Sequence, residues 1–262
     1  MGKVKNTGAG GFPAVNKPVG FWDKKSAVYP RYNTDENSYE ARVLGLIKSA
    51  GVDFAGKSVL DIGCGSGMLT IKIALLADRV TALDISPGML EVLSADAEAH
   101  DVRNIERVCA DFAKYVPETR HDIVFCSMTP AVADEAGKKK LLSLEGATVV
   151  FTGTRESARS NVMNPLFEER GVVPYPLKTA IAMKNILDFE GISHETVPLE
   201  GTWRVGFERE KLEFAVRSTM EGHGIELDDG FLREYLEKFK GDDGRWWEVT
   251  DYFLEIVIWK NP

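Results

Sequence analysis

The chain has 262 residues, which is long for one domain of roughly 150 residues and short for two, so we expect one large domain or one domain with an insertion. Hydrophobic residues make up 44% and charged residues 27% of the composition, which is typical of globular proteins and excludes a disordered or fibrous chain. The 32 basic and 40 acidic residues give a net charge of −8, which disfavours nucleic acid and anionic membranes as partners.

Residues 1–36 are predicted to form a flexible tail followed by a lid. The first twenty residues are rich in glycine and proline, and their start lacks the apolar run of a signal peptide. An aromatic-rich stretch follows, with Phe21, Trp22, Tyr29 and Tyr32. Apolar residues then recur with helical spacing, which predicts a helix over residues 38–50.

From residue 57 onward, short apolar runs alternate with helical patterns. The predicted strands are 58–62, 80–84, 105–110, 121–127 and 147–152. The predicted helices between them include 68–77 and 87–100. Continuous apolar strands separated by helices are typical of a parallel sheet covered on both faces. We therefore predict a doubly wound α/β core over residues 37–154.

The regular alternation of predicted strands and helices ends after residue 152. Helices are predicted over 157–170, 178–189, 210–221 and 228–240, and strands over 194–199 and 247–259. We interpret residues 155–245 as helical additions that cover a substrate, with one core strand among them. Residues 246–262 are predicted to form the final core strand.

A glycine-rich turn joins the first predicted strand to the first helix of the core. Its sequence over residues 59–67 is Val-Leu-Asp-Ile-Gly-Cys-Gly-Ser-Gly. Glycines let the backbone turn tightly and approach a ligand closely, and the helix that follows offers N–H groups. A dinucleotide site would require glycine where this chain has Met68. The turn therefore favours a smaller nucleoside without a pyrophosphate.

Acidic residues stand at the ends of the next two predicted strands. Asp84 follows Gly63 by 21 residues, close to the spacing of an acid that binds ribose hydroxyls. Asp111 could accept a hydrogen bond from an amino group, with Phe112 against a purine face. Each has a plain alternative: Asp84 as a helix cap, and Asp111 and Phe112 as a loop acid beside a core aromatic.

These residues resemble those of class I S-adenosylmethionine-dependent methyltransferases over about residues 38–152. The motifs are the turn at 59–67, Ala-Leu-Asp-Ile-Ser-Pro-Gly-Met-Leu at 82–90, Ala-Asp-Phe at 110–112 and Asp-Ile-Val-Phe at 122–125. The aromatic stretch over 21–32 resembles the N-terminal lid of the ubiquinone/menaquinone-type members. The resemblance implies a seven-stranded, mostly parallel Rossmann-like sheet with an antiparallel final strand, and S-adenosyl-L-methionine as cofactor.

The resemblance also implies roles for individual residues. Asp61 would bind the methionine ammonium beside the backbone of Gly63, Cys64 and Gly65, and Asp84 would bind the ribose hydroxyls. Ile85 and Met89 would line the adenine, whose amino group and ring would contact Asp111 and Phe112. Ser127 would lie near the sulfonium. Tyr29 and Tyr32 could contact the cofactor, although packing within the loop is the alternative for both.

The expected reaction is methyl transfer to a small molecule by in-line displacement, and no residue is marked clearly enough to be its general base. Residues 127–130, Ser-Met-Thr-Pro, lack the second proline and the aromatic of relatives that methylate bases or glutamine amides. Phe21, Trp22, Tyr29, Tyr32, Trp203 and Phe207 are the candidates for an apolar substrate chamber. A nicotinamide or flavin oxidoreductase and a non-catalytic S-adenosylmethionine-binding protein remain the alternatives.

Cysteine and histidine usage is sparse. Cys64, Cys109 and Cys126 lie in strand-like apolar runs, so we expect buried, reduced thiols and a cytoplasmic location. The four histidines show no metal-ligand spacing, and we expect no metal. No apolar run approaches the ~18 residues of a membrane span.

Overall fold

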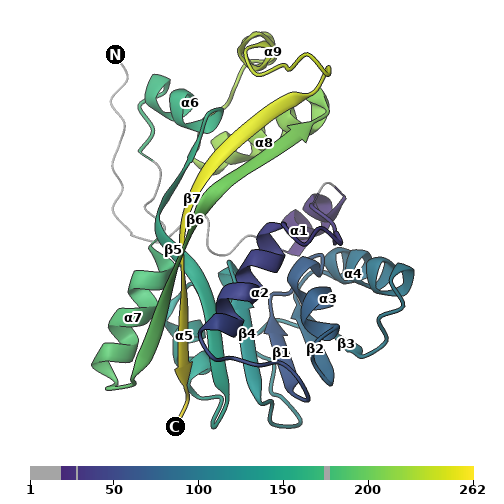
Figure 1. Ribbon diagram of the computed structural model, residues 1–262. Helices are drawn as coiled ribbons and strands as arrows, with labels where there is room; N and C mark the ends of the chain where they lie inside the picture. The colour runs from purple at the N-terminus through teal and green to yellow at the C-terminus, as the bar shows by residue number, and fades with distance from the viewer. Residues whose placement is uncertain (1–18, 28, 174–177) are drawn as a thin grey trace.

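The computed structural model describes residues 19–27, 29–173 and 178–262, so most of the predicted tail lies outside the described residues. The described strands form one seven-stranded sheet in the order β3-β2-β1-β4-β5-β7-β6 (Figure 1). The strands are β1 (Ser58–Ile62), β2 (Arg79–Asp84), β3 (Ile105–Cys109), β4 (Ile123–Ser127), β5 (Thr148–Ser160), β6 (His194–Phe207) and β7 (Trp246–Lys260). Only β7 pairs antiparallel with its neighbours, as predicted.

The helices flank this sheet. They are α1 (Val19–Ser26), α2 (Tyr39–Ser49), α3 (Met68–Ala74), α4 (Pro87–Ala99), α5 (Glu135–Leu142), α6 (Met163–Glu169), α7 (Thr179–Phe189), α8 (Arg209–Gly222) and α9 (Asp229–Glu237). Ser38 caps α2 by accepting a hydrogen bond from the backbone of Ala41, and Ser86 caps α4 with Pro87 in its first turn. None of the helices in the described ranges is long and apolar enough to cross a bilayer.

Each face of the sheet buries its own apolar cluster. On one face, Ile47 of α2 and Ile71 of α3 pack against Phe125 of β4. On the other face, Leu141 of α5 and Met183 of α7 belong to a second cluster. Both sides of the strands are therefore removed from water, which explains their continuous apolar sequences and confirms the doubly wound prediction.

Two strands are much longer than predicted. The strand predicted over 147–152 continues as β5 to Ser160, and the strand predicted over 194–199 continues as β6 to Phe207. The helix predicted over 157–170 is therefore wrong in its first part, and α6 begins only at Met163. Both extensions pair with β7 over most of its length, and this pairing satisfies backbone groups that would otherwise favour a helix.

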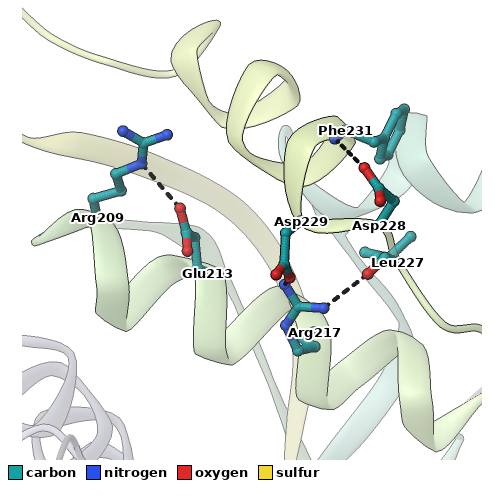
Figure 2. A network of polar contacts seen from close by, with 7 residues as sticks. All are labelled: Arg209, Glu213, Arg217, Leu227, Asp228, Asp229 and Phe231. Atoms are coloured by element: carbon teal, nitrogen blue, oxygen red, sulfur yellow. Dashed lines mark hydrogen bonds and ion pairs between the residues drawn. The ribbon is translucent and has the colours of Figure 1, made fainter.

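The extended ends of β5, β6 and β7, together with α6, α8 and α9, project from the core as an arm (residues 155–172 and 200–253; Figure 1). The arm has its own apolar cluster, formed by Val162, Leu166, Leu212, Val216, Met220, Leu227, Leu232, Tyr235 and Leu236. Polar contacts join α8 to α9: Arg217 donates to the Leu227 carbonyl at 2.8 Å and to Asp229 at 2.6 Å (Figure 2). The arm is thus a packed unit rather than a set of loose helices.

Candidate functional site

The glycine turn between β1 and α3 has a left-handed backbone at all three glycines, with φ of 68° at Gly63, 55° at Gly65 and 86° at Gly67. A Cβ at Gly63 would lie 2.0 Å from the Oγ1 atom of Thr129, and one at Gly67 would lie 2.2 Å from Leu93. Glycine is required at both positions by backbone angle and by space. A Cβ at Gly65 would meet only Tyr29, at 3.9 Å, so this part of the turn is open to a ligand.

Asp84 lies at the carboxyl end of β2 and faces this turn. One of its carboxylate oxygens accepts a hydrogen bond from the backbone N–H of Gly65 at 2.8 Å, and the other accepts from Ser86 at 2.9 Å. Burial raises the pKa of Asp84, and these backbone donors oppose the rise. Because Ser86 itself caps α4, Asp84 is not the N-cap residue of that helix. Each oxygen keeps a lone pair for a hydroxyl group of a ligand.

Asp61, at the end region of β1, is only 3% exposed. It accepts a hydrogen bond from the Thr70 hydroxyl at 2.6 Å. Burial, with a smaller contribution from the charge of Asp84, raises the pKa of Asp61 to about 7, against the effect of the Thr70 hydrogen bond. Among the described residues, no lysine or arginine is a main influence on the pKa of either carboxylate. The turn therefore presents one buried acid, Asp61, and one half-buried acid, Asp84, that a cationic ligand could neutralise.

The predicted N-terminal lid is hydrogen-bonded to the glycine turn and to the start of α4. The Ser66 hydroxyl donates to the carbonyl of Pro30 at 2.6 Å, and Asp23 of α1 accepts from the Ser86 hydroxyl at 2.6 Å and from the Gly88 backbone at 3.1 Å. Burial, together with the nearby charge of Asp84, raises the pKa of Tyr29. Tyr29 thus lies beside Asp84 and the turn, where the sequence predicted a cofactor contact.

Tyr32 occupies a different place in the lid. Its ring packs edge-to-face against His100 with centroids 4.7 Å apart, and the Lys72 ammonium lies 5.4 Å from the ring centroid. The neighbouring Arg31 forms an ion pair with Asp96 of α4. These contacts are with α3 and α4, as the loop-packing alternative expects. Phe21 and Trp22 pack against each other, with centroids 5.2 Å apart.

The residues expected around adenine follow β2 and β3. Ile85 is 37% exposed at the end of β2, whereas Met89 is buried in α4. Asp111 is half-buried and accepts a hydrogen bond from the backbone of Ala113 at 2.9 Å. Phe112 is buried in the apolar cluster beside α5 and α7. Asp111 thus bonds within its own loop and Phe112 packs in the core, as the plain alternative expects. That these two residues bind adenine stays a prediction.

The end of β4 supplies features that the sequence did not mark. Ser127 is half-buried, and Met128, which follows it, adopts a left-handed backbone with φ of 53° and is 46% exposed. A non-glycine residue in this conformation is uncommon and concentrates at functional sites. Tyr39 of α2 comes to the same end of the sheet, where its pKa responds to Ser127. These residues are far apart in the sequence and come together only because α2 packs on the sheet beside β4.

The predicted substrate chamber is only partly assembled. Trp203 of β6 packs against Tyr39 and Tyr252, with ring centroids 5.4 and 4.4 Å apart, so it stands near the end of β4. Phe207 lies farther along β6 and packs against the apolar cluster of the arm. The structure therefore places Trp203 near the candidate site and Phe207 in the arm.

The cysteines differ in exposure, and none of the three forms a disulfide. Cys126 is buried, and Cys64 in the turn is half-buried with its pKa raised by burial. Cys109 is exposed, so the expectation of burial is wrong for this residue, because β3 is the edge strand of the sheet. Among the described residues, no group of three acidic, histidine or cysteine side chains could hold a metal ion.

The region around the glycine turn is similar in sequence to known proteins. Residues 59–144, which contain the glycine turn and Asp84, match the family model of a methyltransferase domain. Over these residues, about a third of its length, the chain is similar to methyltransferase domains. The match does not support the nicotinamide or flavin oxidoreductase alternative.

The curated relatives match only part of this chain. The ribosomal protein L11 methyltransferase of Hahella chejuensis is 35% identical over 100 residues, which are 37% of this chain and 34% of that protein. The mitochondrial ubiquinone biosynthesis O-methyltransferase of Schizosaccharomyces pombe is 34% identical over 99 residues, which are 33% of this chain and 36% of that protein. The chain thus spans about a third of the length of the curated relatives it matches.

A solved structure shares the fold of the methyltransferase domain and its additions. The S-adenosylmethionine-dependent methyltransferase of Thiobacillus denitrificans, in complex with S-adenosyl-L-homocysteine, matches with a TM-score of 0.50 at 15% identity. The match covers 94% of this chain and 99% of that chain. The acids of the turn fit S-adenosylmethionine as well, because its ammonium can offset the charge of buried Asp61 and its ribose hydroxyls can donate to half-buried Asp84.

Proposed function

We propose that the protein transfers a methyl group from S-adenosylmethionine to a small-molecule acceptor. The observation that carries this proposal is the pair of carboxylates, buried Asp61 and half-buried Asp84, beside a glycine turn that is open at Gly65. Asp61 would hold the methionine ammonium and Asp84 the ribose hydroxyls. Tyr29, beside Asp84, would close the groove from the lid side.

When bound, S-adenosylmethionine supplies a methyl group that is already electrophilic because it is attached to a sulfonium. The work left to this chain is to align the acceptor with the methyl carbon and to exclude water. The hydrogen bonds from Ser66 to Pro30 and from Ser86 to Asp23 would help to exclude water, because they hold the lid over the turn. The end of β4, at Ser127, would face the acceptor.

Three observations favour a small molecule over a macromolecular acceptor. Trp203 and Tyr39 give the region beside Ser127 an aromatic wall. Residues 127–130 lack the device expected for base or glutamine methylation. The net charge of −8 disfavours nucleic acid and anionic membrane partners, and the thiols without disulfides are consistent with the proposed cytoplasmic location.

The cofactor part of the proposal is tested by isothermal titration calorimetry with S-adenosylmethionine and S-adenosyl-L-homocysteine. Asp84→Ala removes hydrogen bonds to a charged group, each worth ~1.5–3 kcal/mol, and is expected to weaken binding by about two orders of magnitude or more. Asp53→Ala is the matched control, because Asp53 also accepts a backbone hydrogen bond, from Ala55, but precedes β1. Equal affinities in the two variants would contradict the assignment.

The acceptor part is tested by following S-adenosyl-L-homocysteine formation with a panel of small metabolites and, separately, with ribosomal protein L11. Turnover with a metabolite supports the proposal. Turnover with the protein alone would contradict the small-molecule class and favour a protein acceptor, as in the names of several relatives. Cofactor binding without turnover on either panel would favour the non-catalytic alternative.

A further inference from the structure

Two hydroxyl groups at the carboxyl ends of the central strands are buried and have no hydrogen-bond partner among the described residues. They are the Tyr39 hydroxyl and the Oγ1 atom of Thr152. Thr152 is fully buried, with 0% of its surface exposed. A buried hydroxyl without a partner destabilises the fold, so two of them near one place require an explanation.

The sheet register places Thr152 next to Ser127. The two residues are paired in the parallel ladder between β4 and β5. Two positions earlier on each strand, Phe125 and Val150 lie in the apolar cluster that α2 also joins. Because side chains alternate along a strand, Ser127 and Thr152 face the same α2 side of the sheet, one strand spacing of about 4.8 Å apart.

Tyr39 reaches the same place from α2. The Ser127 hydroxyl lies near the Tyr39 hydroxyl and opposes the rise that burial causes in the pKa of Tyr39, although the two groups form no hydrogen bond of normal geometry. The net effect of the surroundings is to raise that pKa. Tyr39 therefore stays a neutral O–H donor at physiological pH. Its ring is held edge-to-face by Trp203 and Tyr252, at centroid distances of 5.4 and 5.5 Å, so the hydroxyl cannot easily turn away.

The charges around this hydroxyl pair are unfavourable to an anion. The charged or ionisable groups that influence Tyr39 are Glu40, Tyr29 and Tyr252, and none of them is a cation. Asp61, on the strand next to β4, adds further negative charge when ionised. Arg42 is directed to the Glu200 carbonyl and the Tyr252 hydroxyl instead. Apart from the sulfonium of a bound cofactor, a carboxylate or phosphate placed here would find no counter-charge among these protein groups.

We propose that Tyr39 and Thr152, both next to Ser127, bind an uncharged oxygen atom of the methyl acceptor and so select acceptors with a hydroxyl or carbonyl group over acids. The inference rests on the proposed methyl transfer, because Ser127 is the residue that the family resemblance places near the sulfonium. The unpartnered hydroxyls are then the binding groups of a substrate, and their cost to the fold is recovered when the acceptor binds.

The test uses phenol, which combines a flat ring with a neutral hydroxyl, and benzoate, which differs by carrying a charge. Each is titrated into the complex of the protein with S-adenosyl-L-homocysteine and followed by ligand-observed NMR. We expect phenol to bind more tightly than benzoate, and Tyr39→Phe and Thr152→Val each to weaken phenol about three- to tenfold. Tyr235→Phe is the control, because the Tyr235 hydroxyl is bonded to the Val162 carbonyl in the arm.

Thermal unfolding without any acceptor is an independent measurement. Removing an unpartnered hydroxyl should raise the Tm by about 2–4 °C in Tyr39→Phe and in Thr152→Val, whereas removing the bonded hydroxyl in Tyr235→Phe should lower it. A lower Tm in Tyr39→Phe would show that its hydroxyl is bonded in the unliganded protein and would overturn the inference. Equal phenol affinity in all variants, or no phenol binding, would overturn it as well.

The two proposals fail in different ways. If the wild-type protein binds neither S-adenosylmethionine nor S-adenosyl-L-homocysteine, the proposed function is wrong and this inference fails with it. If cofactor binding is intact and depends on Asp84, but phenol does not discriminate between wild type and the Tyr39 and Thr152 variants, only the acceptor-oxygen site is wrong.

Discussion

The core around the glycine turn and the arm differ in how their charged groups are partnered. In the core, Asp61 is buried and Asp84 is half-buried, and in the described part of the chain no cation is among the main influences on their pKa values. Two core hydroxyls also lack partners among the described residues. In the arm, charged side chains are paired, as in Arg209 with Glu213 and Arg217 with Asp229 (Figure 2). Polar groups left unsatisfied in a fold are available to a ligand, so the contrast separates the binding region from the structural one.

The largest effect is expected from the apolar cluster of the arm. Leu212→Ala removes a side chain with 0% exposure and should reduce the free energy of unfolding by about 2–5 kcal/mol, measured by chemical denaturation. Phe214→Ala, on the same helix but 46% exposed, is the control and should cost much less. If the arm is structural only, the folded Leu212 variant keeps its affinity for S-adenosyl-L-homocysteine, and a large loss of affinity would break the comparison.

Asp61 should make the stability of the core depend on pH. Its pKa in the folded protein, about 7, is above the value of about 4 for an unfolded chain, so the folded state holds the extra proton between these values. The free energy of unfolding should therefore fall as the pH rises from 4 to 7, by roughly 2–4 kcal/mol in total, and stay low above pH 7.

The measurement compares chemical denaturation of the wild type and Asp61→Asn at pH 5 and pH 8. The asparagine variant cannot release the proton and should lose less stability than the wild type over this interval. Parallel pH profiles for the two proteins would show that Asp61 is not the titrating group. Arm variants such as Asp229→Asn should leave the profile unchanged.

The three glycines of the turn should differ in their tolerance of a methyl group. Gly63→Ala meets Thr129 at 2.0 Å and should cost about 1–3 kcal/mol more than Gly65→Ala, which meets only Tyr29 at 3.9 Å. The positive φ is common to both positions, so the difference isolates the contact with Thr129. Denaturation curves for the two variants check it, and equal losses would mean that the loop after β4 yields easily.

The smallest effect is expected at the surface of the arm. Asp229 has a side chain that is 76% exposed and pairs with Arg217, so Asp229→Asn should change the free energy of unfolding by less than about 1 kcal/mol. The effect should shrink further at high salt. A loss as large as that of Leu212→Ala would show that ion pairs, rather than apolar packing, hold α8 to α9.

The fold of the core was predictable because its strands are buried on both faces. A strand such as β4 is buried over residues 123–126, and these residues, Ile-Val-Phe-Cys, read as a continuous apolar run. The turn was predictable for a different reason, since Gly63 and Gly67 are forced by backbone angle and crowding. Asp84 followed from its spacing after Gly63.

The arm and the hydroxyl pair were not predictable in the same way. The end of β5, residues 155–160, is polar and suits a helix locally, and it becomes a strand only through pairing with β7, about 95 residues later in the chain. Tyr39 and Thr152 are far apart in the sequence and ordinary in type. Their significance lies in the hydrogen bonds they do not make, which only a folded structure shows.

The connection between arm and core also has a mechanical consequence. Three hydrogen-bonded strands cross from one to the other, and β6 and β7 stay paired from His194 with Trp259 to Phe207 with Trp246. A hinge here would have to break a ladder of backbone hydrogen bonds, whereas a single loop would bend freely. We expect the arm and the sheet to move as one rigid body. A force on the helices of the arm would then displace the strand ends beside Ser127.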